Sequence, residues 1–352
     1  MNNLDVLRAV AVLCVLLDHL LWRILADDWH YVEQVLGRTG VLLFFVHTAL
    51  VLMRSSQGLY ATADGTAGWV KAFYVRRWFR IYPLSIAVVA FIVVTALPAG
   101  TTRGMIAANV LLIQNLVGSP NLESVLWTLP IEIQMYVLLP LCFLFARRGA
   151  RPAFGLFLAA VLVGIPICLT HPKQELSITP LALAIFGPCF MSGVLAYGIL
   201  SSAGAQRRRF DGKWWPLILL AAVAVFSLAL QPAWNSPIRG WPLPLTVGLM
   251  IPLFSDMPSS FLSKAAKVVA KYSYSIYLLH VPLLIIAFVK TAGSLAVHLA
   301  VFGVLMIVVP YLAYRFIEDP GIRIGQRIAG VISRRAPARA PDQDIGLATG
   351  AS

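Results

Sequence analysis

The chain has 352 residues, of which 59% are hydrophobic and only 12% are charged, and its mean hydropathy is +0.81. This composition excludes a soluble globular domain, because such domains are far less apolar. Apolar runs of the length needed to cross a hydrocarbon layer of about 30 Å recur along the chain, without the alternation of barrel strands. The sequence therefore predicts an all-α, polytopic membrane helix bundle.

The net charge of +13 does not indicate a nucleic-acid partner, because the basic residues are sorted by loop instead of gathered in one patch. The N-terminal end and every second loop, with the C-terminal end, hold 22 of the 28 Lys and Arg. By the positive-inside rule, this split predicts a multi-pass membrane protein with both termini in the cytoplasm. About ten spans are expected, near residues 5–22, 39–53, 83–97, 125–145, 153–170, 180–200, 215–231, 242–255, 272–289 and 295–314.

A single membrane domain is predicted over residues 1–318. Within it, "MIAANVLLIQNLVG" (105–118) is apolar but short, and counting it as a span moves the basic "RRGAR" loop to the outer side. We therefore expect it to form one short non-spanning helix. Residues 319–352 end in a segment rich in Pro, Ala and Gly without periodicity, which predicts a disordered cytoplasmic tail.

The first predicted span, "VLRAVAVLCVLLDHLLW", carries three ionisable residues in an apolar segment. Arg8 and His19 are eleven residues apart, which is three helical turns plus about 20°, so they share one face with a rise of roughly 16 Å between them. Asp18 points about 80° to 100° away from His19. Ionisable groups at this depth are mostly functional, and imidazole exchanges a proton near neutral pH. His19 is thus a candidate catalytic residue, with a structural hydrogen-bonding histidine as the alternative.

Two arginines of "FYVRRWFRIYPL" precede the third predicted span. Arg77 and Arg80 are three residues apart and face one way on a helical turn. Such a pair suits bidentate binding of a phosphate group. The alternative is a basic anchor on the cytoplasmic side of the membrane.

The segment "LWTLPIEIQMYVLLPL" opens the fourth predicted span. Glu132 falls in its first two turns, Tyr136 lies one turn further on the same face, and Trp127 stands at its start. A carboxylate at this depth has to line a wet cavity or find a partner. These residues are therefore candidates for a cavity wall.

Two further histidines, His47 and His280, lie at membrane depth in the second and ninth predicted spans. None of the intramembrane histidines shows the i, i+4 spacing of a helix-borne pair of metal ligands. We therefore expect no metal site. The tenth span ends in "FIEDP", which contains Glu318.

These blocks, in this order, resemble the integral-membrane acyltransferase 3 family, whose bacterial members O-acylate surface polysaccharides, lipopolysaccharide and Nod factors. The resemblance covers residues 4 to about 320. It rests on the arginine, ten residues and histidine of "LDVLRAVAVLCVLLDH", and on "GRTGVLLFF", "RRWFRIYP", "LWTLPIEIQMYVLLP", "YSYSIYLLHVP" and "FIEDP". The chain departs from the family pattern at "FFVHTAL", where His47 and Thr48 stand in place of Ser-Gly.

The resemblance implies an enzyme that transfers acyl groups other than aminoacyl groups. It moves an acyl group, acetyl by expectation, from acyl-CoA to a hydroxyl of a cell-surface or secreted glycan or glycolipid. The resemblance also implies the bacterial inner membrane as the location. The implied partners are this donor, this acceptor and membrane lipids; no permanently bound cofactor and no nucleic acid are expected, and the need for a protein partner is left open. The rival function is a transporter or flippase of a lipid-linked glycan, whose path would be lined by the same polar residues.

The family's roles carry over onto five residues of this chain. Binding of the donor phosphates falls to Arg8, Arg77 and Arg80, and catalysis to His19 and Glu132. His19 either deprotonates the acceptor hydroxyl or transiently takes the acyl group, while Glu132 orients the acceptor or tunes the imidazole. The remaining candidates for substrate binding or the cavity wall are Asp18, His47, Trp127, Tyr136 and His280.

Overall fold

The computed structural model describes residues 1–25, 30–95, 97–171, 179–202, 210–230 and 237–333. Helices make up nearly all of this part, and the β-structure within it is one isolated bridge between Phe210 and Phe254. The all-α fold class is therefore confirmed. The long helices are α1 (Asn2–Leu25), α2 (His30–Thr62), α3 (Gly65–Thr95), α5 (Thr128–Ala146), α6 (Ala150–Thr170), α7 (Ala182–Ser201), α8 (Trp215–Leu230), α10 (Phe261–Ile285), α11 (Leu295–Ala313) and α12 (Asp319–Ser333).

Short helical elements connect or extend the long ones. They are α4 (Arg103–Leu111), α9 (Pro242–Met250), the 3-10 helices η1 (Ser124–Trp127), η3 (Gly212–Trp214), η4 (Pro237–Gly240) and η5 (Ile251–Leu253), and the π-helices η6 (Ile286–Lys290) and η7 (Tyr314–Glu318). The expected non-spanning segment overlaps α4, whose nine residues rise about 14 Å, too short to cross a bilayer.

Eight helical segments in the described residues are long and apolar enough to cross a membrane. The polytopic architecture is thereby confirmed, but the number of spans differs from ten. The eight do not include α1, whose 24 residues are enough to cross a membrane but which carries four charged side chains, Asp5, Arg8, Asp18 and Arg23. The prediction of a span at 242–255 is wrong, because α9 has only nine residues. Pro252 follows it, and the chain turns through η5.

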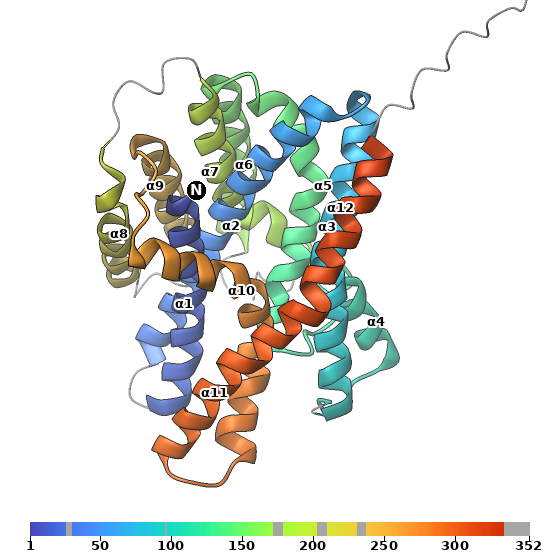
Figure 1. Ribbon diagram of the computed structural model, residues 1–352, viewed down its shortest axis with the longest axis vertical. Helices are drawn as coiled ribbons and strands as arrows, with labels where there is room; N and C mark the ends of the chain where they lie inside the picture. The colour runs from blue at the N-terminus through green and yellow to red at the C-terminus, as the bar shows by residue number, and fades with distance from the viewer. Residues whose placement is uncertain (26–29, 96, 172–178, 203–209, 231–236, 334–352) are drawn as a thin grey trace, which may run out of the picture.

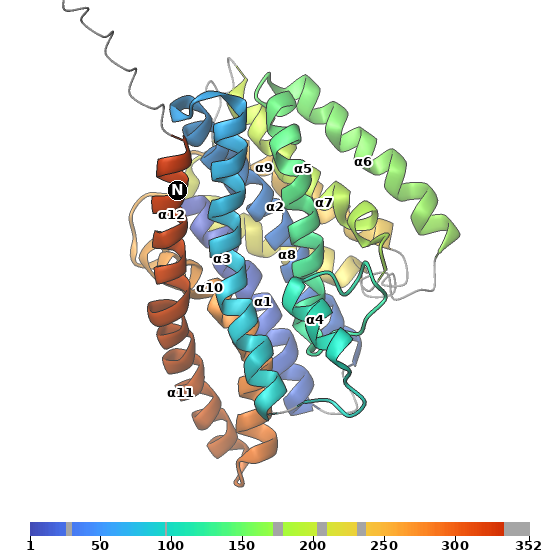
Figure 2. The ribbon, with the colours of Figure 1, turned by 90° about the vertical axis from the view of Figure 1, so that its right-hand side faces the viewer.

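The helices surround α2, which packs against α1 on one side and α7 on the other. In Figure 1, α11, η7 and α12 form one long rod, of which α12 lies beside α3 and α11 packs on α10; Figure 2 shows α12 beside α3 from the side. Figure 2 also shows α6 leaning outward on the opposite side of the bundle, where it packs on α7. The segments that carry the candidate residues therefore lie inside the bundle.

Helices α1 and α10 run side by side in the same direction. Three contacts along their length establish this: Arg8 Nε donates a hydrogen bond to Ser273 Oγ at 2.5 Å, the rings of His19 and His280 lie 4.9 Å apart, and Arg23 reaches the Phe288 carbonyl just beyond α10 at 3.5 Å. The two helices thus hold the face of α1 predicted to carry Arg8 and His19 against a matching face of α10.

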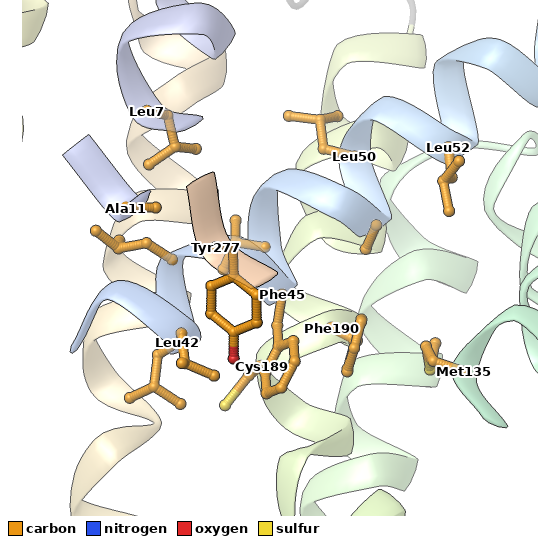
Figure 3. Close-up of a cluster of buried hydrophobic side chains, with 14 of the residues drawn as sticks. Leu7, Ala11, Leu42, Phe45, Leu50, Leu52, Met135, Cys189, Phe190 and Tyr277 are labelled. Atoms are coloured by element: carbon orange, nitrogen blue, oxygen red, sulfur yellow. The ribbon is translucent and has the colours of Figure 1, made fainter. Parts of the chain in front are cut away.

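A buried apolar core fills the space between α1, α2, α7 and α10 (Figure 3). Phe45 of α2 stacks on Phe190 of α7 with ring centroids 4.3 Å apart. At Gly193 of α7 the backbone of α2 comes so close that an added Cβ would lie 2.9 Å from the Ala49 Cβ and 3.0 Å from the Leu50 nitrogen. This glycine lets the two helices approach, because a side chain there has no room.

The chain stays helical beyond residue 318. Residues 319–333, expected to belong to a disordered tail, form α12 and pack on α3. The physical reason is a row of small residues at four-residue spacing: Gly321 and Gly325 sit directly against Phe79 of α3. The remainder of the expected tail, residues 334–352, lies outside the described residues.

Replacing Gly193 with alanine should destabilise the bundle. The new methyl group overlaps the backbone of α2, and overpacking of this kind costs about 1–3 kcal/mol. Gly303→Ala on α11 is the matched control, because nothing lies within 4 Å of its added Cβ and alanine favours helix. Thermal unfolding in detergent should show a lower midpoint for Gly193→Ala only; equal midpoints would contradict the close packing of α2 on α7.

Candidate active site

A cavity of about 80 Å³ lies where α1, α2, α3, α5 and α10 meet. By the same measure a water molecule needs about 10–15 Å³, so the cavity holds several waters or a small ligand group. Polar and apolar side chains share its wall. Its lining consists of Arg8, Val41, Phe44, Phe45, His47, Thr48, Val51, Leu52, Arg77, Arg80, Ile81, Thr128, Leu129, Glu132, Tyr136, Ser273, Tyr274 and Tyr277.

Positive charge dominates this lining. Three arginines, Arg8, Arg77 and Arg80, face a single lining carboxylate, Glu132. Arg77 makes no ion pair or hydrogen bond with another residue in the described part of the chain, and the one hydrogen bond of Arg8 goes to the neutral Ser273 hydroxyl. Cations at membrane depth need a counter-charge, so the cavity attracts an anionic ligand.

The third arginine is held differently. Arg80 of α3 forms an ion pair with Glu318, which also accepts a hydrogen bond from Ser275 of α10 at 2.7 Å. The Arg80 guanidinium also lies over the Tyr274 ring, 5.2 Å from its centroid. Glu318 is 1% exposed, so the carboxylate of this pair is shielded from solvent, while the Arg80 side chain is partly exposed. Arg80 therefore ties α3, α10 and η7 together and offers less free charge than Arg77.

The single lining carboxylate is engaged within its own helix. Tyr136 donates a hydrogen bond to Glu132 across one turn of α5, as the shared face predicted, and both residues line the cavity. A phenol donor stabilises the ionised carboxylate. The pair thus places a hydrogen-bond acceptor, the Glu132 carboxylate, in the same cavity wall as the arginines.

His47 and Thr48 on α2 also line the cavity. His47 is buried, and no hydrogen bond joins it to another residue within the described ranges. The position where this chain departs from the family pattern therefore faces the same space as the arginines.

His19 and His280 lie apart from the cavity lining. Their rings meet edge to face with centroids 4.9 Å apart, and each ring's Nδ1 faces a backbone carbonyl one turn back, at 2.9 Å for His19 and Val15 and 2.7 Å for His280 and Tyr277. A carbonyl only accepts, so each Nδ1 carries the proton and each Nε2 a lone pair. Tyr277 separates the two places: it lines the cavity, and its ring lies 6.1 Å from that of His280.

Two candidates have other surroundings. Asp18 accepts a hydrogen bond from the Gly37 amide of α2 at 2.8 Å, which links α1 to α2 outside the cavity. Trp127 packs on Phe186, with ring centroids 5.4 Å apart, and is not part of the cavity lining. The structure therefore brings Arg8, His47, Arg77, Arg80, Glu132 and Tyr136 together and leaves Asp18, His19, Trp127 and His280 outside that group.

Sequence reasoning missed several residues around the cavity. Ser273 and Tyr277 of α10 carry no charge, and their positions follow from the pairing of α10 with α1 and η1. Glu123 precedes η1 and accepts hydrogen bonds from the Ser124 hydroxyl at 2.6 Å and the Val125 amide at 3.2 Å. Burial raises the pKa of the Glu123 carboxyl to about 7. Its place in "ESVLW", just before a predicted span, was the available signal.

Comparison with known proteins assigns the family. A family model described as an acyltransferase domain matches residues 1–315. The chain belongs to the acyltransferase 3 family. Nodulation protein 10 of Rhizobium leguminosarum bv. viciae is 25% identical to this acyltransferase over 315 aligned residues, which cover 79% of this chain and 82% of that protein. No solved structure matches the chain.

This membership confirms the resemblance stated from the sequence blocks. It identifies the protein as a membrane acyltransferase and favours acyl transfer over the transporter or flippase alternative. The cavity with its arginines and the neighbouring histidine pair belong to the matched residues, so they are the candidate active site of this acyltransferase.

Removing the carboxylate of the buried ion pair should destabilise the protein more than removing its sequence neighbour. Glu318→Gln leaves the Arg80 charge buried without its counter-charge, which costs about 3–5 kcal/mol. Asp319→Asn is the control: it breaks only an ion pair with Arg323, whose side chain is 60% exposed, and such pairs contribute about 0–1 kcal/mol. Thermal unfolding of the purified variants measures both effects, and a Glu318→Gln midpoint equal to that of Asp319→Asn would refute the stabilising role of the Arg80–Glu318 ion pair.

Proposed function

We propose that this acyltransferase moves an acyl group, acetyl in the first instance, from acyl-CoA to a hydroxyl of a cell-surface or secreted glycan or glycolipid. In this proposal it transfers acyl groups other than aminoacyl groups and resides in the bacterial inner membrane with both termini in the cytoplasm. The observation that carries the proposal is the arginine-lined cavity of a chain that belongs to an acyltransferase family.

Donor binding is proposed at the cavity. Coenzyme A carries phosphate groups, and Arg8 and Arg77 are the two lining arginines that form no ion pair with a carboxylate of the described residues. Guanidinium groups bind phosphate through paired N–H donors and remain charged at all working pH values. Arg80 contributes to the same positive field while its ion pair with Glu318 holds α3 in place.

The acyl group is proposed to reach His19 along α1. Arg8 and His19 lie on one face of this helix with a rise of about 16 Å between them, a separation that the extended pantetheine arm of coenzyme A can bridge. The path passes Tyr277, which stands between the cavity and the histidine pair. The donor phosphates and the reacting thioester thereby occupy different levels of the bundle.

His19 is proposed as the group that handles the acceptor proton or the acyl group. Its Nδ1 donates to the Val15 carbonyl, so the Nε2 lone pair is free to take a proton or to attack a thioester carbon. Glu132 is proposed to orient the acceptor or to tune the charge of the site from the opposite wall. The acceptor itself is proposed to be a glycan hydroxyl on the grounds of the family resemblance.

Arg77→Lys should weaken donor binding without reducing the amount of protein in the membrane. Lysine keeps the charge but loses the bidentate geometry, and a hydrogen bond to a charged group is worth about 1.5–3 kcal/mol, so KM for acyl-CoA should rise about tenfold or more. Arg147→Lys is the control, since Arg147 lies over the Tyr60 ring outside the cavity lining. An unchanged KM in Arg77→Lys would make Arg77 a membrane anchor only.

His19→Gln tests the catalytic assignment. Glutamine keeps hydrogen bonding and roughly the volume of histidine but cannot take a proton near neutral pH, so acceptor acylation should fall by on the order of 10² to 10⁴ while acyl-CoA still binds. His19→Ala should behave alike, whereas Arg8→Ala should impair acyl-CoA use. Acylation of the acceptor by purified protein, with donor binding measured in parallel, separates these effects. Wild-type turnover in His19→Gln would refute the role of His19.

A further inference from the structure

His47 is an imidazole among the arginines of the cavity. It lies on α2, is 4% exposed, and lines the same space as Arg8 and Arg77. No hydrogen bond connects its ring with another residue in the part of the chain that the structure describes. A buried imidazole ordinarily has a partner, so an imidazole that faces a cavity without one is placed to bind a ligand.

The charged and titratable groups that share the cavity with His47 lie on α1, α3, α5 and α10. Arg8 of α1 interacts with it electrostatically, and α3 contributes Arg77 and Arg80. The acidic or phenolic groups of the same wall are Glu132 and Tyr136 of α5 and Tyr274 and Tyr277 of α10. Positive neighbours disfavour a positively charged imidazole, and a bound anion that neutralises them removes this repulsion and adds attraction.

We propose that His47 is part of the donor-binding site and takes up a proton when the diphosphate of coenzyme A binds beside Arg8 and Arg77. The inference rests on the proposed donor site and extends it by one residue. The proton comes from solvent and no covalent bond changes. The protonated ring then donates an N–H to a phosphate oxygen, which makes the bond charge-assisted.

Proton uptake gives this role a distinct signature. Arginine stays charged throughout, so binding by arginines alone does not vary with pH near neutrality. A histidine that is neutral in the free protein and protonated in the complex makes affinity fall as pH rises, by about tenfold per pH unit over the range in which one full proton is taken up. We expect this dependence of affinity on pH between about pH 6 and 8, where a histidine side chain can change its protonation state.

The experiment measures binding of dephospho-coenzyme A to the purified full-length protein by calorimetry at pH 6.0, 7.0 and 8.0, in two buffers of different ionisation enthalpy. This probe has a diphosphate that does not titrate in the range, so any proton taken up belongs to the protein. In the wild type we expect affinity to fall with pH and nearly one proton to be taken up at the middle of the range. His47→Gln should bind with a pH-independent affinity and no proton uptake.

His298→Gln is the matched control, because His298 packs on Phe288 away from the cavity and should keep the wild-type pH dependence. Unaltered proton uptake in His47→Gln would overturn the inference while leaving the donor site intact. The inference would also be overturned if His47→Gln bound the donor as the wild type does but no longer transferred the acyl group. His47 would then act in the reaction and not in donor binding. No binding of the probe by wild-type protein would refute the proposed donor site instead.

Discussion

A positive charge at membrane depth needs a counter-charge, and Glu318 supplies it to Arg80 across the contact between α3 and η7. Glu318 stands in the π-helix η7, where the long rod of α11 and α12 passes α3, and Ser275 holds its second oxygen from α10. One carboxylate therefore joins three segments that are far apart in the sequence. The position of α3, and with it the place of Arg77, depends on this pair.

Once Arg80 is neutralised, the other two lining arginines define what the cavity can bind. Arg8 is oriented by the Ser273 hydroxyl and Arg77 has no carboxylate of its own in the described residues, so both guanidinium groups remain available to an anion. Glu132 is occupied by Tyr136 on the same helix. The cavity thus combines one structural cation with two that have room for a ligand.

The parallel pairing of α1 with α10 places two groups of polar residues at different depths along the same two helices. The same two helices carry Arg8 with Ser273 at the cavity and His19 with His280 beyond it. The His280 Nε2 is buried without a hydrogen-bond partner in the described chain, which is unusual for a polar atom and marks the histidine pair as more than packing. Tyr277, anchored to Thr128 by a 2.8 Å hydrogen bond between hydroxyls, stands between the two levels.

The sequence by itself determined the helical membrane class, because hydropathy and the loss of water as a hydrogen-bond partner leave helices as the only fit to these apolar runs. It also determined that Arg8 and His19 share a face and that Tyr136 lies beneath Glu132, since both follow from 3.6 residues per turn. It missed the helix α12 because small residues at four-residue spacing stabilise a helix only when a partner such as Phe79 is present.

Only the tertiary structure decided which candidates meet. His19 and His47 are both histidines at membrane depth, yet His47 faces the arginines and His19 faces His280. Likewise Arg77 and Arg80 occupy one helical face, and the carboxylate that separates their roles comes from 238 residues further along the chain than Arg80. Local periodicity places a side chain on a helix, but its partners depend on how helices distant in sequence pack together, which no local pattern records.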